Sequence, residues 1–283
     1  MTDITSSGCH GAHLRCRGGV APDASDRTAR AAFCGVSALL FAASVVTTIA
    51  WSRSMTAMGG LPMSGGWMLP VMWTRMCGES WLGAAASFLA MWTAMMPAMM
   101  LPAMMPTLWR YRRALGRTAA DAAGRLTALV GAGYFVVWVL SGAALFPLGA
   151  ALAGIEMQQP VLARAAPLAA GAIVLLAGVM QFTAWKADHL ACFRDAPGHS
   201  LPADAAAALR HGLRLGLHCS AGSAGLTAIL LVSDMMDLRV MAVVTAAITL
   251  ERLAPSGEAT ARVIGAIACA AGLLLIARAA SLG

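Results

Sequence analysis

The chain has 283 residues, of which 59% are hydrophobic and 12% are charged, and its net charge is +7. Soluble domains carry about 25% charged residues, so a water-soluble fold is excluded because too few polar side chains are available to cover its surface. The basic residues are spread between hydrophobic segments, which is typical of membrane proteins and argues against nucleic acid as a partner. Composition therefore predicts an all-α, polytopic integral membrane helix bundle in a lipid bilayer.

The N-terminal tail, residues 1–30, is expected to be cytoplasmic and disordered. It carries a C-H-x2-H-x2-C cluster, and a Cys₂His₂ set is a common ligand set for zinc. The spacing matches no standard zinc finger, so a cluster without a metal is the alternative. Its members are Cys9, His10, His13 and Cys16.

A single transmembrane domain, residues 31–283, is expected after the tail. Stretches of about 20 apolar residues predict membrane helices, and about seven are present. The first is long enough to be a retained signal anchor. The sixth is the shortest and forms a tight hairpin with the fifth. The seven stretches are 32–51, 82–107, 126–150, 164–185, 213–233, 238–254 and 261–281.

The distribution of basic residues predicts a cytoplasmic N-terminus and an external C-terminus. The longest loops are then an outer loop, 52–81, rich in Met, Gly and Pro, and a cytoplasmic loop, 186–212, rich in His. With this orientation, few of the 20 Lys and Arg residues lie outside, namely Arg53, Arg75, Arg164, Arg239 and Arg278.

Most of the 19 methionines lie in the outer loop and in the helix that comes after it. Helical residues four apart share a face, so this helix carries two columns of thioethers, which are soft ligands suited to Cu(I). Methionine also fills irregular cores, and packing is the alternative interpretation. The candidate metal ligands here are Met55, Met58, Met63, Met91, Met95, Met96, Met99, Met100, Met104 and Met105.

Three prolines, Pro97, Pro102 and Pro106, fall in the methionine-rich helix. Each removes a backbone donor, so we expect a helix that is broken beside a cavity or simply kinked. Broken membrane helices are tolerated where they line a cavity or pack on neighbours.

Two smaller groups extend the set of candidate ligands. Asp234, Met235, Met236 and Asp237 lie in the expected outer turn, where a solvated turn is the alternative. His218 and Cys219 begin the fifth helix, where close helix packing is the alternative. A further pair, Glu251 and Arg252, ends the sixth helix and is expected to form an ion pair at the membrane interface.

No catalytic motif accompanies these ligands. The sequence has no P-loop, no H-E-x-x-H and no nucleophile elbow, and it lacks the C-P-C and D-K-T-G-T signatures of soft-metal pumps. We therefore do not expect an enzyme.

The stretch Met91–Pro102, M-W-T-A-M-M-P-A-M-M-L-P, resembles the M-W-x-x-M-M-x-A-M-M-x-P signature of the bacterial DUF2182 family of predicted metal-binding integral membrane proteins. Further similar blocks occur in order along residues 50–280. They are Tyr134-x3-Trp138, Gly178–Lys186 with Cys192 and Arg194, His211–Cys219, and Glu251–Pro255.

The chain departs from the family pattern after Cys219. Where the family has Cys-Cys-Trp, this chain has Gly222, Ser223 and Ala224, which shifts weight from thiolates to methionines. The resemblance implies a multi-pass protein of the bacterial inner membrane that binds a metal. It implies no reaction.

The leading hypothesis is a protein that binds a soft metal ion, Cu(I), in copper transport or as a membrane-bound copper chaperone. Ions would enter at the outer loop and pass along the methionine columns toward His218 and Cys219. A membrane or periplasmic protein is then a possible partner. The alternative is a structural or assembly subunit of a membrane complex whose methionine-rich helix is a partner interface.

Overall fold

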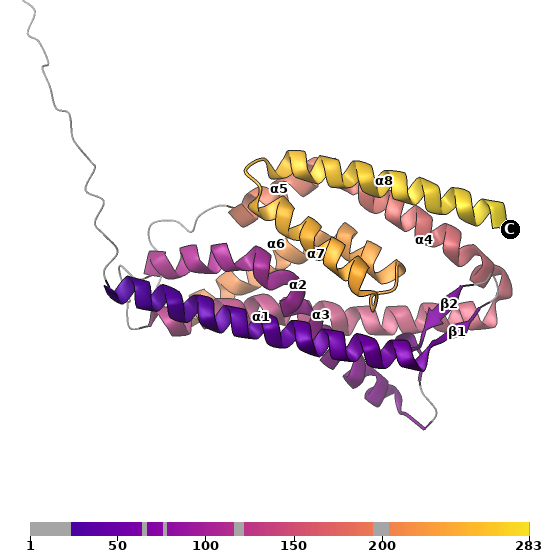
Figure 1. The fold of residues 1–283 in the computed structure, drawn as a ribbon, viewed down its shortest axis with the longest axis horizontal. Helices are drawn as coiled ribbons and strands as arrows, with labels where there is room; N and C mark the ends of the chain where they lie inside the picture. The colour runs from indigo at the N-terminus through magenta and orange to yellow at the C-terminus, as the bar shows by residue number, and fades with distance from the viewer. Residues whose placement is uncertain (1–23, 64–66, 76–77, 116–121, 195–203, 283) are drawn as a thin grey trace, which may run out of the picture. The chain divides into compact units, whose positions relative to one another are not determined.

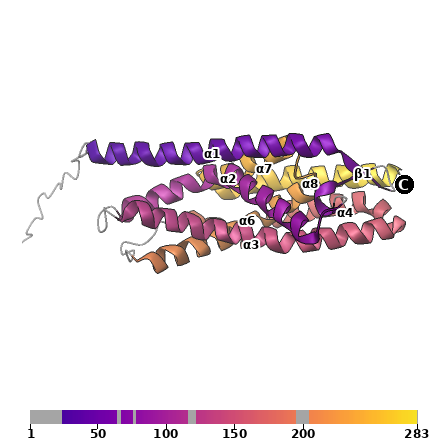
Figure 2. The ribbon, with the colours of Figure 1, turned by 90° about the horizontal axis from the view of Figure 1, so that it is seen from below.

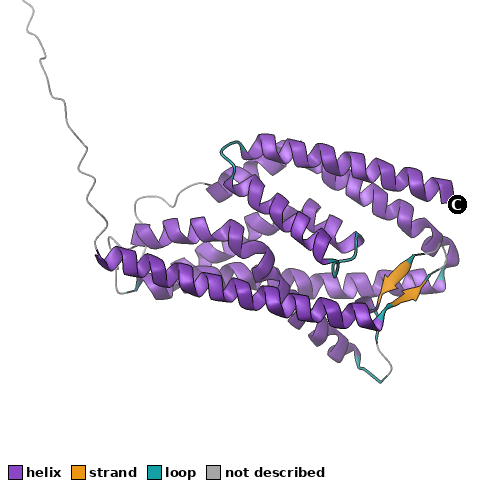
Figure 3. Ribbon diagram, viewed as in Figure 1, coloured by secondary structure: helices purple, strands orange, loops and turns teal. Residues whose placement is uncertain are grey.

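The computed structural model describes residues 24–63, 67–75, 78–115, 122–194 and 204–282. The chain divides into two compact units, 1–38 and 39–283, and the second contains all of the elements from β1 onward. The described elements are α1 (Ala24–Met58), β1 (Gly60–Pro62), β2 (Met68–Pro70), η1 (Val71–Trp73), α2 (Trp81–Leu115), α3 (Ala123–Gln158), α4 (Pro160–Met180), α5 (Ala184–Arg194), α6 (Ala205–Val232), α7 (Leu238–Leu253) and α8 (Gly257–Leu282). Figure 3 shows that helices dominate.

The predicted class, an all-α polytopic membrane bundle, is confirmed. Six described helices are long and apolar enough to cross a bilayer, namely α1, α2, α3, α4, α6 and α8. The stretch predicted at 238–254 is α7, whose 16 residues reach about 24 Å at 1.5 Å per residue. That length falls short of the roughly 30 Å hydrocarbon core, so α7 is not among the six.

Several element boundaries differ from the predicted ones. Helix α1 begins at Ala24, inside the predicted tail, and runs to Met58, inside the predicted outer loop. The predicted cytoplasmic loop contains most of α5 and the start of α6. The predicted fourth span ran to residue 185, whereas α4 ends at Met180. The Cys9–Cys16 cluster lies outside the described residues.

The prolines do not break α2. One helix continues from Trp81 to Leu115 through Pro97, Pro102 and Pro106, and Figure 1 shows that it changes direction along its course. A kinked helix is therefore what these prolines produce.

A β-hairpin and two turns gather at one end of the second unit, here called the hairpin end. In the hairpin, Leu61 pairs with Leu69 across the antiparallel register. The Trp67 indole donates to the carbonyl of Ala163 at the start of α4, over 2.8 Å. The Ser52 hydroxyl on α1 donates to the carbonyl of Met236, in the α6–α7 turn, over 2.7 Å. Helix α5 lies at the opposite end, the α5 end.

Helices α4 and α8 run side by side (Figure 1), and glycines form their interface. A Cβ on Gly178 would lie 2.7 Å from the backbone nitrogen of Cys269 and 2.9 Å from the carbonyl of Gly265. Small residues allow this close approach, which is how membrane helices gain packing energy in the absence of a hydrophobic driving force.

Substituting Gly178 with alanine should destabilise the protein by about 1–3 kcal/mol, the usual range for overpacking, because two of the three nearest atoms belong to the α8 backbone and the third is the Cys269 sulfur. Gly131→Ala on α3 is the matched control, since a Cβ there meets nothing within 4 Å, and it should be neutral or slightly stabilising. Equilibrium unfolding in mixed detergent micelles measures both. Equal stability of the two variants would contradict the prediction.

Helices α3 and α6 also lie side by side, in both Figure 1 and Figure 2. A Cβ on Gly133 would come 2.7 Å from the carbonyl of Leu209, and one on Gly216 would come 2.8 Å from the carbonyl of Tyr134. This contact fixes the register of α6 against α3. It therefore also fixes where Cys219, three residues after Gly216, meets Tyr134.

Candidate functional site

The methionine columns of α2 face the interior of the protein. The exposed fractions of Met91, Met95, Met96, Met99, Met100 and Met104 lie between 0% and 3%. Met105, which belongs to neither column, is half-buried. The bundle therefore contains a row of thioethers that is shielded from lipid.

At one position the row meets a cysteine from another helix. The Sγ atom of Cys219, on α6, lies 4.0 Å from the Sδ atom of Met100, and both side chains have an exposed fraction of 0%. The Tyr134 hydroxyl lies 2.7 Å from the same Sγ. The structure thus brings a predicted thiol and a predicted thioether together.

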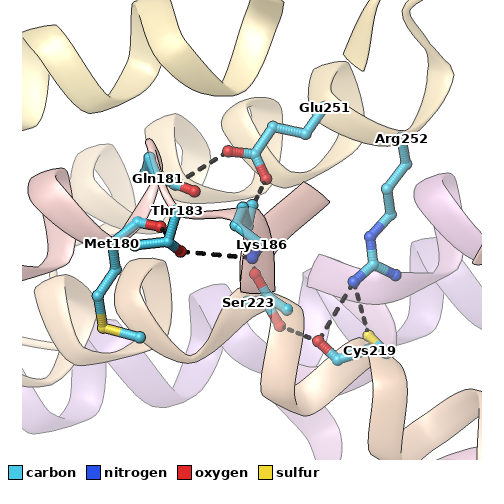
Figure 4. A network of polar contacts seen from close by, with 9 residues as sticks. Met180, Gln181, Thr183, Lys186, Cys219, Ser223, Glu251 and Arg252 are labelled. Atoms are coloured by element: carbon cyan, nitrogen blue, oxygen red, sulfur yellow. Dashed lines mark hydrogen bonds and ion pairs between the residues drawn. The ribbon is translucent and has the colours of Figure 1, made fainter. Parts of the chain in front are cut away.

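A cation from α7 completes this group. The Arg252 guanidinium donates to Cys219 Sγ over 3.0 Å and to the Cys219 carbonyl over 3.4 Å, as Figure 4 shows. The Ser223 hydroxyl donates to the same carbonyl over 2.6 Å. These contacts hold the backbone and the sulfur of Cys219 in one orientation.

A buried ion pair lies next to this cluster. Lys186 Nζ donates to Glu251 Oε2 over 2.7 Å and to the carbonyl of Gly222 over 2.6 Å. The Gln181 amide donates to the other Glu251 oxygen over 2.9 Å, and Figure 4 shows the three side chains together. The side chains of Lys186 and Glu251 are only 4% and 2% exposed.

Both members of the pair lie outside the six membrane-spanning candidates. Burial lowers the pKa of Lys186 and raises the pKa of Glu251, while their mutual attraction opposes both changes. Desolvation disfavours the charged form of either group, so each ion depends on the other and on the hydrogen bonds around it.

The turn after α4 supplies two members of this network. The backbone amides of Gln181, Phe182 and Thr183 bond to carbonyls three residues earlier, which tightens the chain at the helix end. The Thr183 hydroxyl also donates to the Met180 carbonyl over 2.7 Å. Helix α5 starts at once, so Gln181 and Lys186 both point toward Glu251.

The predicted interfacial pair of Glu251 and Arg252 is wrong. Glu251 is 1% exposed and pairs with Lys186, and Arg252 donates to Cys219. Successive residues on a helix point about 100° apart, so α7 sends these two side chains to two different partners.

A second group of sulfurs lies at the hairpin end. A small cavity of about 80 Å³ is lined by Met55 of α1, Met72 of η1 and Met91 of α2, together with Glu79. Met55 and Met91 were predicted ligands. Met91 also heads the first column of α2, so this cavity adjoins the buried thioether row.

The remaining predicted ligands are not brought into either group. Met63 is half-buried, and the side chain of Met58 lies outside the described residues. Asp234 and Asp237 are exposed, and their carboxylates accept from the backbone amides of Met236 and Arg239. They therefore shape the α6–α7 turn. Beside them, Met235 and Met236 are buried.

His218 points away from its neighbour Cys219. It is exposed, and its ring packs edgewise on His189 with centroids 5.5 Å apart. In the described part of the chain, no three His, Cys, Asp or Glu side chains are grouped so that they could hold a metal ion. Any metal site built from these residues therefore depends on methionine sulfur.

The sequence alone did not identify several residues of the network around Cys219 and Glu251, or of the cavity at the hairpin end. Tyr134, Gln181 and Lys186 occur in blocks that carry the family resemblance, but nothing in the sequence says that these blocks meet. The sequence presents Met72 only as one methionine of the outer loop, and no motif singles out Glu79. The order of the blocks along the chain was the one available signal.

The fold and the site define a multi-pass helical membrane protein with a buried row of sulfur atoms. A family model described as PpoB2, copper chaperone, matches residues 89–275, and the chain belongs to this copper chaperone family. The match confirms the copper-related part of the predicted resemblance but not the name DUF2182. No curated protein and no solved structure matches the chain.

Proposed function

We propose that this protein is a membrane-embedded Cu(I) chaperone that holds its cargo between Cys219 and Met100. The observation that carries the proposal is the 4.0 Å separation of the two buried sulfur atoms. A metal–thiolate bond is about 2.3 Å long, so one ion can bridge two sulfurs at roughly this distance. Cysteine and methionine sulfur both select Cu(I) over hard cations.

The charges around Cys219 fit a site that is loaded and emptied. Cysteine binds metals as the thiolate, and the guanidinium of Arg252, which lies 3.0 Å from Cys219 Sγ, would offset the negative charge of that thiolate. Arg252 also donates to the Cys219 carbonyl, so the guanidinium would keep one hydrogen bond at this site when an ion occupies the sulfur.

The buried methionines of α2 give the ion a route to this site. Thioethers are neutral, and Met95, Met96 and Met99 lie between Met91 and Met100 on the same helix. An ion that moves along them stays bound to sulfur and out of contact with lipid. Release at the α5 end to the far side of the membrane would make the same route a transport path.

The alternative of a structural subunit required the methionines of α2 to face a partner. Six of them are at most 3% exposed within this chain alone, which leaves them unavailable to another protein. Their burial therefore favours a metal route or internal packing over a partner interface.

The test is anaerobic titration of the purified protein with Cu(I) against a chromogenic Cu(I) chelator. Cys219→Ser combined with Met100→Leu should remove one bound copper per chain, because both ligands of the proposed site are lost. Leucine keeps nearly the volume of methionine, and size-exclusion chromatography shows whether the variant stays folded.

The matched control is Cys269→Ser with Met180→Leu. Cys269 is a half-buried thiol on α8, bonded to the Leu175 carbonyl, and Met180 ends α4 with a 38% exposed side chain. This control should bind copper like the wild type. Copper stoichiometry that is unchanged in the Cys219/Met100 variant would overturn the proposed site.

A further inference from the structure

The cavity at the hairpin end lies largely beyond the family match. Three of its chemically important residues, Met55, Met72 and Glu79, precede residue 89, where the match begins. The residues matched by the copper chaperone family model therefore do not include these three. They are brought together by the first helix and by the segment that follows the hairpin.

The thioethers come from three separate elements of the fold. Met55 lies near the end of α1, Met72 in η1 and Met91 on α2, and all three line one cavity. Met72 and Met91 are 9% and 3% exposed, and Met55 is half-buried. The cavity that these thioethers line is partly open to the surface, so a small ion can reach the sulfur atoms.

Among the described residues that line this cavity, Glu79 is the one with a formal charge. A Cβ on Gly83 would lie 3.1 Å from Glu79 Cγ and 3.3 Å from Oε1, so the carboxylate lies over the first turn of α2, where the helix dipole favours negative charge. The nearby guanidinium of Arg75 lies instead over the Trp81 ring, 5.0 Å from its centroid.

We propose that Met55, Met72 and Met91 form a second metal site, a capture site for a soft monovalent cation, with Glu79 as its counter-charge. Neutral thioethers leave the charge of such an ion uncompensated, and a carboxylate beside them offsets it. Because Met91 also heads the buried row, an ion held here lies at the entrance to the route toward Cys219. The capture of the ion at this site does not depend on the proposed function. Only its later passage to Cys219 rests on that function.

The experiment counts Ag(I) ions bound to the purified protein, since Ag(I) shares the ligand preference of Cu(I) and stays in one oxidation state in air. We expect two ions per wild-type chain, one at each site. Met55→Leu combined with Met72→Leu should lose one ion and keep the other. X-ray absorption of the Cys219→Ser/Met100→Leu variant should then show only thioether and oxygen ligands.

The matched control is Met68→Leu, since Met68 belongs to the same hairpin but is 55% exposed and does not line the cavity. It should keep both ions. Glu79→Gln should weaken binding of one ion by about tenfold, equivalent to about 1.4 kcal/mol, while the leucine variants remain the decisive test.

The outcomes separate the two proposals. Two ions in the Met55/Met72 variant would overturn the capture site and leave the Cys219 site standing. An ion count that changes with Met55 and Met72 but not with Cys219 and Met100 would overturn the proposed function and leave the capture site standing. Loss of an ion in the Met68 control would also overturn the capture site, because binding would then depend on a methionine that does not line the cavity.

Discussion

Lys186→Met should lower the free energy of unfolding by about 3–5 kcal/mol, the usual cost of removing one partner from a buried ion pair. The substitution leaves the carboxylate of Glu251 in the interior beside the neutral amide of Gln181 and without its lysine. It also removes the Lys186 donor from the Gly222 carbonyl. Equilibrium unfolding in mixed detergent micelles measures the change.

The double variant Lys186→Met/Glu251→Leu should regain much of this loss, because no charge of the pair then remains in the interior. Arg262→Met is the control, since Arg262 pairs with Glu258 at the surface with side chains 66% and 64% exposed, and exposed pairs contribute about 0.2–1 kcal/mol. If Lys186→Met lowered the free energy of unfolding no more than Arg262→Met does, the buried pair would not stabilise the fold.

Trp92→Ala should cost about 3–5 kcal/mol, the range for removing a large aromatic core side chain. Trp92 is 0% exposed and donates from its indole to the Trp138 carbonyl over 2.7 Å. It also stacks on Phe88 with ring centroids 5.9 Å apart. Because Trp92 is the residue after Met91 on α2, its loss should also loosen the register of the methionine columns.

Trp92→Phe separates the contribution of the packed aromatic ring from that of the indole hydrogen bond. It keeps an aromatic ring but loses the hydrogen bond to the Trp138 carbonyl, which still accepts from the Ser141 hydroxyl over 2.7 Å. It should therefore cost about 0.5–1.5 kcal/mol, the net contribution of one hydrogen bond. Trp81→Ala is the control because Trp81 is 51% exposed. Both changes in unfolding free energy are measured in the same micelle assay. If Trp92→Ala destabilised the protein no more than Trp81→Ala, Trp92 would not be the core residue that we describe.

The fold class and the helices were predictable because a bilayer demands long apolar segments, and these stand out in the sequence. Helix α7 was less predictable, since its 16 residues resemble a short span. The end of α4 was placed too late because Gln181 to Trp185 continue a largely apolar run. The backbone turn there depends on the Thr183 hydroxyl and on partners from α7.

The candidate site was predictable only in part. Met100 and Cys219 were both recognised as soft ligands, but nothing in the sequence distinguishes Met100 from its neighbouring methionines. Which methionine lies next to Cys219 depends on the register of α6 against α3, and backbone contact at Gly133 and Gly216 sets that register. Arg252 was assigned to Glu251 because adjacent opposite charges suggest a pair.

The glycine interface of α4 and α8 has a consequence for movement. The two backbones meet at Gly171, Gly178, Gly265 and Gly272, and a Cβ on Gly272 would come 2.6 Å from the backbone nitrogen of Leu175. Because the backbones of α4 and α8 are in contact at successive turns, the two helices resist sliding past each other. We therefore expect this pair to be the rigid part of the bundle. The compliant part is α2, where each of three prolines removes a backbone donor. Of the proposed ligands, Met91 and Met100 thus lie on the helix that bends, whereas Cys219 lies on α6.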